Sequence, residues 1–340
     1  MNFSGLKDAG SFEYWKKHFT DLPADWSPGR VITTFKKRYL IKISNGLVEG
    51  DLSGRLKHNA GSPVDLPVVG DWVAISGDRQ QVLIRRVFPR KSVLTRKTAG
   101  RTFEKQVLAA NVDVAFIVQA LDRDYNLNRL ERYMTVVYSG NITPAVVLNK
   151  VDIPEEHEVK CRFEEVRKRF PETMLFLVSA LYGKGIEEIR HFLEPGLTFC
   201  LVGSSGVGKS TLINAIAGEN LAETGDVSTS TTKGVHITSR RQLHMLSNGT
   251  ILIDMPGLRE IGIADADEGL NKTFPRIFEL AANCRFDDCT HTREPDCAVK
   301  RAVNEGTLDV RQYENYMNLR QEYKQYTQQV MEKTWKTSRK

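Results

Sequence analysis

The sequence predicts a multidomain α/β protein, and three observations lead to this prediction. The chain has 340 residues, 41% hydrophobic and 26% charged, enough for roughly two or three separate cores. Short β-like runs separated by turn signals fill residues 30–88, and apolar runs alternate with amphipathic stretches after about residue 106. From about residue 270 the chain is polar and helical. We therefore expect a small β-barrel, a mainly parallel sheet with helices on both faces, and a helical domain.

Composition excludes several classes of protein. The apolar fraction is too high for wholesale disorder, and five cysteines, an odd number, argue against a disulfide framework. No apolar run approaches the roughly 18 residues that cross a bilayer, and the first residues lack the apolar core of a signal peptide. We expect a cytoplasmic monomer with no membrane partner.

Residues 1–27 read as a lead-in with a short helix near Phe12–Phe19, and residues 28–105 as an OB-like, RNA-binding barrel. From Arg30 to Lys105 there are sixteen Lys and Arg against six acids, so this stretch carries about +10. Such charge favours a polyanion, and nucleic acid is the commonest one. The candidate contacts are Arg85-Arg86, Arg90-Lys91, Arg96-Lys97 and Lys36-Lys37-Arg38-Tyr39. A solvated sheet surface is the alternative.

The region 106–268 has the alternation typical of a parallel sheet with helical crossovers. Its apolar runs, which we expect to be strands, span residues 112–121, 144–150, 174–180, 197–203 and 250–257. The expected helices between them span residues 127–138, 156–169 and 185–193. Residues 269–340 should form a helical domain that ends in a charged helix near 311–333.

A phosphate-binding loop is predicted at residues 203–211, which match G-x-x-x-x-G-K-[ST] between an apolar strand and a helix. The residues are Gly203, Ser204, Ser205, Gly206, Val207, Gly208, Lys209, Ser210 and Thr211. The glycines let successive backbone N–H groups turn toward phosphate oxygens. Lys209 can reach the β and γ phosphates, and the Ser210 hydroxyl can bind Mg²⁺. The strand–loop–helix setting argues against a chance glycine-rich turn.

A second motif, Asp254-Met255-Pro256-Gly257, closes an apolar strand about 45 residues later. Asp254 can hold Mg²⁺ through water, and the Gly257 N–H can face the γ-phosphate. Without the phosphate loop before it, a strand-ending turn would be the better interpretation.

A third motif predicts the base. Asn149, Lys150, Val151 and Asp152 close the run 144–150, and Ser179 and Ala180 close the run 174–180. Guanine presents two adjacent donors, which the acceptor-only carboxylate of Asp152 can receive, whereas adenine presents no such pair. Lys150 can lie along the base, Asn149 can brace the loop, and the Ser179-Ala180 backbone can face guanine O6. Ligands bind at strand ends in open α/β sheets, so GTP is favoured over ATP.

The order of these motifs is permuted. The base motifs at 149 and 179 precede the phosphate loop at 203 and the D-x-x-G motif at 254, whereas ordinary GTPases begin with the phosphate loop. A circular permutation moves the termini and can leave the sheet intact.

A cysteine cluster predicts a metal site. Cys284, Cys289, His291 and Cys297 lie within fourteen residues and form a plausible tetrahedral Zn²⁺ set. A closed ligand set indicates one structural zinc ion, and free thiols are the alternative.

Together these features resemble the circularly permuted ribosome-assembly GTPases called ribosome small-subunit-dependent GTPase A, the RsgA family. The resemblance runs from about Arg30 to past Cys297. It rests on the motif order, the cysteine–histidine spacing and the stretches 69–73, 90–92, 110–113 and 234–236. It implies an OB barrel, a GTPase domain and a zinc domain. The implied function is late maturation of the small (30S) ribosomal subunit through 16S rRNA, with subunit-stimulated hydrolysis of GTP to GDP and phosphate.

The chain departs from the family in switch I, where it reads Gly234-Val235-His236-Ile237-Thr238 instead of G-R-H-T-T. Thr238 is the candidate threonine for Mg²⁺ and the γ-phosphate, with Thr231 and Thr232 as alternatives. Leu258 follows the D-x-x-G motif and cannot polarise water. We therefore expect slow basal turnover, with His236 or a partner group orienting the water.

Two other functions stay open at this point. One is a permuted GTPase that acts on a different RNA or on a membrane-associated assembly. The other is an RNA-binding assembly module in which GTP is only a structural ligand.

Overall fold

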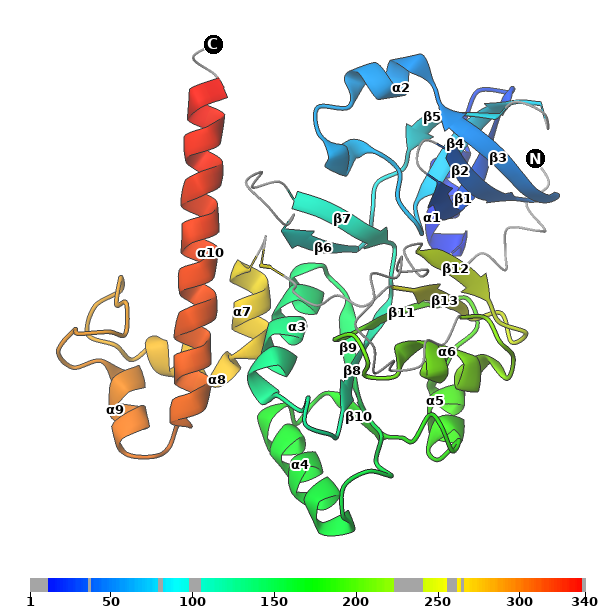
Figure 1. Cartoon of the computed structure of the whole chain (residues 1–340). Coiled ribbons are helices and arrows are strands. Elements are labelled where there is room, and N and C mark those ends of the chain that lie inside the picture. Colours follow the sequence, from blue (N-terminus) through cyan, green and yellow to red (C-terminus); the bar gives the residue numbers. More distant parts are fainter. Residues whose placement is uncertain are drawn as a thin grey trace, which may run out of the picture.

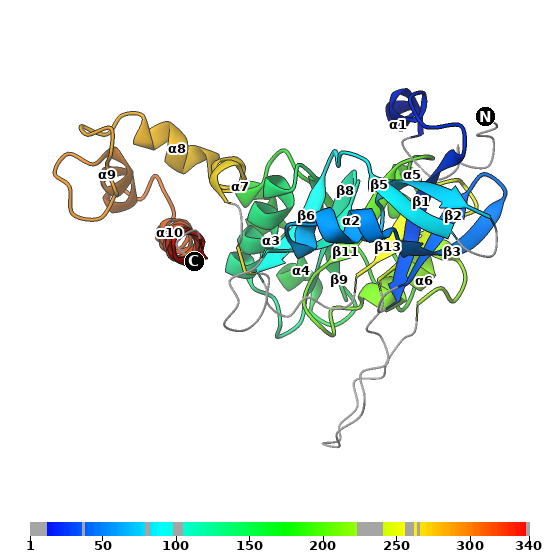
Figure 2. The ribbon, with the colours of Figure 1, turned by 90° about the horizontal axis from the view of Figure 1, so that it is seen from above.

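The chain forms three regions, which a computed structural model describes over residues 12–35, 38–78, 82–97, 105–222, 241–255, 262–263 and 266–337. Figure 1 shows an N-terminal barrel, a central α/β region and C-terminal helices. The view in Figure 2 also places the C-terminal helices on the far side of the central region from the barrel. No described helix is long and apolar enough to cross a membrane.

The N-terminal region is a closed five-stranded barrel, as the short strands predicted. Strand β1 pairs with both β2 and β4, which closes the order β1-β2-β3-β5-β4 into a ring. The strands are β1 (Trp26–Phe35), β2 (Arg38–Ile43), β3 (Gly46–Leu52), β4 (Trp72–Gly77) and β5 (Val82–Val87), with helix α2 (Gly54–Asn59) after β3. Inward-facing residues such as Val31, Ile41 and Ile84 fill the interior.

The predicted N-terminal helix is confirmed as α1 (Phe12–Phe19). Trp15 and Phe19 are buried against Trp72 and Phe88 on the outside of the barrel. The Phe19 ring centroid lies 5.4 Å from that of Trp72 and 5.2 Å from that of Phe88. These aromatic contacts explain why so short a helix is held in place.

The central region is a six-stranded, mainly parallel sheet, as the apolar runs predicted. The order is β10-β9-β8-β11-β13-β12, and only the β12–β13 pair is antiparallel. The strands are β8 (Val114–Ala120), β9 (Thr143–Asn149), β10 (Met174–Leu177), β11 (Thr198–Val202), β12 (Gln242–Met245) and β13 (Ile251–Asp254). Strand β12 did not stand out in the sequence, because it has only four residues and lacks an apolar run.

Helices cover both faces of this sheet. Alternate side chains of β8 point to opposite faces, so Ala115 and Ile117 lie in one core, while Phe116 and Val118 lie in another. The first core packs against α3 (Leu127–Ser139), α4 (Glu156–Arg169) and α7 (Asp267–Thr273), and the second against α5 (Ile186–Phe192) and α6 (Lys209–Ala217).

The barrel and the central sheet are continuous. Thr33 of β1 pairs with Gln242 of β12, and the Thr33 hydroxyl donates to the Arg241 carbonyl oxygen over 2.8 Å. This pairing makes one eleven-stranded sheet. A separate hairpin of β6 (Val93–Lys97) and β7 (Lys105–Ala110) leads from one region to the other.

A buried arginine seals the junction between these two regions. Arg30 of the barrel donates from Nη2 to the Thr198 hydroxyl of β11 over 2.9 Å and to the Asn111 carbonyl over 3.3 Å. Its side chain is fully buried, and burial lowers its pKa to about 10, against the charges of Asp113 and Asp71. The arginine therefore stays charged at neutral pH and is fixed by partners from both regions.

Two of the predicted RNA contacts face inward instead. Arg90 pairs with the buried Asp71 over 2.7 Å, and Lys91 pairs with Asp113 at the junction. Tyr39 is buried in the barrel core, so its ring is not exposed beside Arg38. The phosphate clamp itself stays a prediction. Asp71 is buried and Asp113 is partly buried, and both hold a cation because an unpaired charge away from water costs far more than a solvated one. Lys36 and Lys37 lie outside the described residues.

The C-terminal region contains α8 (Pro275–Ala281), α9 (Ala298–Asn304) and the 28-residue helix α10 (Val310–Thr337). Figure 1 shows α10 beside α7, with its C-terminal half standing clear of the other helices. The predicted charged helix is confirmed, and it starts one residue earlier and ends four residues later than expected. Tyr316 and Leu319 of α10 are buried in the same core as α3.

Candidate nucleotide and metal sites

The predicted phosphate loop connects β11 to the first residue of α6, so the N-terminus of that helix faces the loop. Gly203 and Gly208 have φ angles of 153° and 94°, in the region that favours glycine. A side chain at Gly203 would also come within 2.4 Å of the Val118 carbonyl oxygen. The loop shape therefore requires these two glycines.

Lys209 is folded back onto this loop. Its ammonium donates to the carbonyl oxygens of Gly203 over 3.0 Å and of Ser204 over 2.6 Å. Burial lowers the pKa of Lys209 to about 8, while the charges of Asp254 and Asp124 oppose that shift. The lysine is thus protonated at neutral pH and sits where a phosphate would be attracted.

Asp254 ends β13 beside the phosphate loop. Burial raises the pKa of its carboxyl, and the nearby Lys209 charge lowers it. The structure therefore brings Asp254 and Lys209 together, as a shared Mg²⁺ and phosphate site requires. The remaining predicted residues of the switch regions lie outside the described residues: Gly257, Leu258, Thr231, Thr232, His236 and Thr238.

Asn149 joins three of the predicted loops. Its side-chain amide donates to the Val207 carbonyl oxygen in the phosphate loop over 2.9 Å. Its amide oxygen accepts from the Ala180 N–H over 3.0 Å, so the loop of Ser179 and Ala180 is held as well. A side chain at Gly208 would come within 2.4 Å of the Asn149 amide nitrogen. The brace expected at Asn149 is therefore made, and the loops meet at one edge of the sheet.

The neighbouring base-loop residues are placed for a ligand outside the sheet. Lys150 has a φ of 62°, and its ammonium pairs with Asp122 over 3.0 Å. Val151 anchors the loop through its N–H to the Val178 carbonyl oxygen over 3.2 Å. Asp152 is exposed beyond this anchor. Its carboxylate is therefore accessible to a base.

Sequence reasoning missed a group of charged residues that follows β8. Burial favours the neutral form of Asp122, but hydrogen bonds from the Asp124 N–H and Lys150 outweigh it and lower the pKa of Asp122. Arg129, near the start of α3, donates to both carboxylate oxygens of Asp124 and to the Ser204 hydroxyl, each over 2.7 Å. Their position in the chain could have identified these residues, because β8 ends at the same edge of the sheet as the motif loops.

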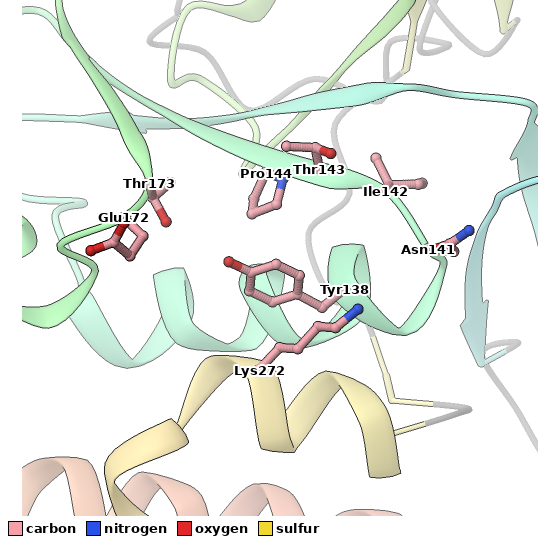
Figure 3. Close-up of a pocket in the computed structure, with 8 residues that line it drawn as sticks. All are labelled: Tyr138, Asn141, Ile142, Thr143, Pro144, Glu172, Thr173 and Lys272. Carbon is pink, nitrogen blue, oxygen red and sulfur yellow. The ribbon is translucent and has the colours of Figure 1, made fainter.

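A separate pocket lies at the opposite end of β9. Its volume is about 210 Å³, and in Figure 3 the ring of Tyr138 lies between the side chain of Lys272 and the residues Thr143 and Pro144. Thr143 begins β9 and Asn149 ends it, so the pocket is roughly 20 Å from the motif loops at 3.3 Å per residue. This pocket is therefore not part of the candidate nucleotide site.

The predicted metal ligands converge. The ligand atoms of Cys284, Cys289, His291 and Cys297 all lie within 4.8 Å of one another. The Cys284 Sγ is 3.8 Å from the Cys297 Sγ and 3.7 Å from the His291 Nδ1, which is 3.5 Å from the Cys297 Sγ. Tetrahedral zinc with ordinary bond lengths sets its ligand atoms roughly 3.5–3.8 Å apart. The cluster therefore fits a zinc ion.

Hydrogen bonds around the cluster fix its ligands. The Tyr313 hydroxyl of α10 donates to the His291 carbonyl oxygen over 2.7 Å. Cys297 precedes α9, and its sulfur accepts from the Lys300 N–H over 3.5 Å. The loop that carries the ligands is thus attached to both α9 and α10.

Comparison with known proteins identifies the family. The model described as RsgA GTPase matches residues 87–264, just over half of the chain. The chain belongs to the RsgA GTPase family. Membership makes it a GTPase, a hydrolase that acts on GTP. A second model, described as 50S ribosome-binding GTPase, matches residues 198–333.

Similar proteins cover nearly the whole chain. The small ribosomal subunit biogenesis GTPase RsgA of Opitutus terrae is 41% identical over 307 residues, which are 87% of this chain and 83% of that protein. The protein of the same name from Syntrophotalea carbinolica is 40% identical over 329 residues, 93% of this chain and 89% of that one.

Two solved structures share the fold. YjeQ from Thermotoga maritima has a TM-score of 0.65 at 25% identity, and covers 88% of this chain and 98% of its own. YloQ, described as a circularly permuted GTPase, has a TM-score of 0.64 at 21% identity over 89% and 96% of the two chains. The permuted GTPase fold predicted from motif order is therefore confirmed.

Proposed function

We propose that this chain binds the small ribosomal subunit, acts in its late maturation, and hydrolyses GTP to GDP and phosphate when the subunit stimulates it. The observation that carries the nucleotide site is the double contact of Asn149, which ties the base loop to the phosphate loop. The ribosomal role is supported by relatives about 40% identical that are named small ribosomal subunit biogenesis GTPases.

In this proposal Asp152 selects guanine, because its carboxylate can accept from both donors on the base. Lys150 lies along the base, and its ion pair with Asp122 fixes its ammonium group. The phosphates lie in the loop 203–211, where backbone N–H groups and Lys209 neutralise their charge. Binding then requires the Lys209 ammonium to exchange its contacts with Gly203 and Ser204 for contacts with phosphate oxygens.

The proposed magnesium ligands are the Ser210 hydroxyl and, through water, Asp254. When bound, Mg²⁺ would neutralise charge that develops on the β and γ phosphates. We propose His236 and Thr238 as the remaining catalytic residues, with Thr238 near the γ-phosphate. His236 or a partner group would orient the water, because Leu258 has no polar atom to do so.

The proposed zinc ion is structural. Three thiolates and one imidazole complete a tetrahedral set and leave no position for a substrate. Bound there, zinc would hold the loop between α8 and α9 in place. The distances between the ligand atoms support this assignment.

The proposed domains are residues 28–105, 106–268 and 269–340, after a lead-in of residues 1–27. The first of these, the basic barrel, is the proposed contact with 16S rRNA. Because Arg90 and Lys91 pair with less exposed carboxylates, exposed cations become the stronger candidates. These are Arg55, Lys57 and Arg38, whose pair with Glu49 lies at the surface. Phosphate contacts predict a steep loss of binding with salt. We propose a monomer that works in the cytoplasm, where ribosomal subunits mature.

Single-turnover hydrolysis of GTP and ATP, with and without purified small subunits, tests the function. We expect GTP to be preferred and the subunits to accelerate its hydrolysis. The chain should also copurify with small subunits in a non-hydrolysable GTP analogue. GTP binding without stimulation would favour an assembly module with structural GTP, and stimulation by a different RNA would favour another partner.

A further inference from the structure

The side chain of Ser204 is held by α3. Arg129 donates to the Ser204 hydroxyl over 2.7 Å, and Tyr133, one turn later on the helix, also hydrogen-bonds that hydroxyl. Arg129 is itself fixed by both carboxylate oxygens of Asp124. A charge-assisted hydrogen bond with a braced donor holds its partner more strongly than a neutral one.

The main chain of the same serine holds the phosphate-binding lysine. The Ser204 carbonyl oxygen accepts from the Lys209 ammonium over 2.6 Å. Ser204 therefore connects α3, through its side chain, to Lys209, through its backbone. A shift of α3 would therefore move the Ser204 backbone, and with it the loop that receives the phosphates, even after Lys209 has exchanged this contact for phosphate oxygens.

The next residues of α3 are bound to the C-terminal helix. Arg132 pairs with Glu322 of α10 over 2.7 Å. The Asn315 amide of α10 donates to the Asn128 carbonyl oxygen over 3.2 Å and to the carboxylate of Glu131, which is fully buried. The first two turns of α3 thus contact the phosphate loop and α10 at once.

We propose that Arg129 is a positioning residue for the phosphate loop and that α10 sets the position of that loop through α3. This proposal rests on the proposed nucleotide site, and it does not depend on which partner the chain serves. It gives the C-terminal helix a regulatory role: a partner that displaces α10 changes nucleotide affinity. The coupling is reciprocal, so bound nucleotide changes the preferred position of α10 by the same free energy.

A second connection must be kept apart in the test. Glu322 also accepts from the Ile263 N–H over 3.3 Å. Ile263 lies nine residues after Asp254, so this contact connects α10 to the nucleotide site by a route that does not pass through α3. Replacing Glu322 would break both connections. Arg132→Met and Asn315→Ala remove contacts between α3 and α10 and leave the Glu322–Ile263 contact in place.

The first experiment measures the dissociation constants of fluorescent GDP and GTP analogues for the full chain. Arg129→Met and Ser204→Ala should each weaken binding about tenfold, the loss expected for one charge-assisted hydrogen bond. The double variant should bind no more weakly than Ser204→Ala, because both changes remove the same contact. Arg129→Lys should restore part of the affinity. Unchanged affinity, or losses that multiply, would overturn the positioning role.

The second experiment tests α10. Asn315→Ala and Arg132→Met should each weaken nucleotide binding about threefold in the unmodified chain and not at all in the Arg129→Met background. Arg276→Met is the matched control, since its pair with Glu279 lies exposed on α8, and it should leave affinity unchanged. Equal losses in both backgrounds, or none in either, would refute coupling through α3.

A failure of the proposed coupling can be told apart from misfolding of a variant and from failure of the proposed function. The Arg132–Glu322 pair is about one-third exposed, so Arg132→Met should keep the fold, which a melting curve checks before binding is measured. No ribosomal subunit is present in either experiment. Failure of the coupling therefore leaves the ribosomal role standing, whereas failure of the unmodified chain to bind guanine nucleotide would overturn the nucleotide site itself.

Discussion

The side-chain amide of Asn149 donates to the backbone carbonyl oxygen of Val207, 58 residues later in the chain, over 2.9 Å. The last residue of β9 is thereby fixed to the loop after β11, although β8 lies between these strands in the sheet. Base recognition and phosphate binding share this contact, so the site depends on it as a whole.

Asn149→Ala should weaken binding of both GTP and GDP by at least about tenfold. The change leaves the Val207 carbonyl and the Ala180 N–H without their partner, and each buried unpaired group costs about 1–3 kcal/mol. Fluorescent-nucleotide titration measures the loss. Asn283→Ala, at an exposed position that bonds to Glu279, is the control and should bind normally. Equal affinity for Asn149→Ala and the control would contradict the shared contact.

Asp152→Asn should exchange the preferred base. Xanthine carries a carbonyl where guanine carries the N2 amino group, so an amide can donate to it and a carboxylate cannot. We expect the affinity for GTP to fall about a hundredfold and the affinity for xanthosine triphosphate to rise. Competition binding with both nucleotides is the measurement. Glu156→Gln, fully exposed at the start of α4, should keep the original preference.

Cys297→Ser should abolish zinc binding and loosen the C-terminal region. The serine hydroxyl is a poor replacement for a thiolate, and structural zinc contributes several kcal/mol to the domain that it organises. Mass spectrometry of the intact chain should find one zinc in the unmodified protein and none in the variant, with faster proteolysis between α8 and α9. Cys161 is exposed on α4, so the control variant Cys161→Ser should retain the metal. Zinc loss without faster proteolysis would argue against a structural role.

Glu131 should make stability depend on pH near neutrality. Burial raises the pKa of this carboxyl to about 7, from 4.5, despite Arg169 and Asn315 beside it and with a smaller contribution from Asp309. Because its pKa is higher in the folded state, the folded chain gains a proton between pH 8 and pH 6 that the unfolded chain does not. The unfolding free energy should therefore rise by about 1 kcal/mol as pH falls over this range.

Glu131→Gln tests that dependence, because an amide does not titrate. The difference between the two proteins should be larger at pH 6 than at pH 8, as measured by denaturant unfolding at both values. A control at Glu279, an exposed carboxylate on α8, should leave the pH dependence of the unmodified chain intact. An unchanged slope in Glu131→Gln would mean that this carboxyl does not titrate between pH 6 and pH 8.

Much of the fold could be predicted from local pattern. Helix α4 was expected at residues 156–169 and found there, because its amphipathic run is long and flanked by polar turns. Strand β12 is too short, and too poor in apolar residues, to stand out in the sequence, and its pairing with the distant Thr33 leaves no local pattern. Pattern reports which face a residue prefers, whereas pairing between distant segments depends on tertiary contacts.

The candidate site was predictable where a motif has fixed spacing. Lys209, Asp152 and the zinc ligands follow patterns whose geometry the chemistry dictates. The role of Arg129 could not be read in the same way, since its partner Ser204 lies 75 residues away. The pairing of Arg90 with Asp71 is likewise invisible in composition, and it turned an expected RNA contact into an internal one.

The pairing of β1 with β12 determines how a truncated fragment of this chain should behave. A fragment that ends after β7 would leave Thr33 without its partners at β12 and Arg30 without Thr198. Such a fragment should be less stable than the same barrel in the full chain, because it lacks these contacts. The RNA-binding role of the barrel is therefore better tested in the full chain, with single substitutions of the barrel's exposed cations.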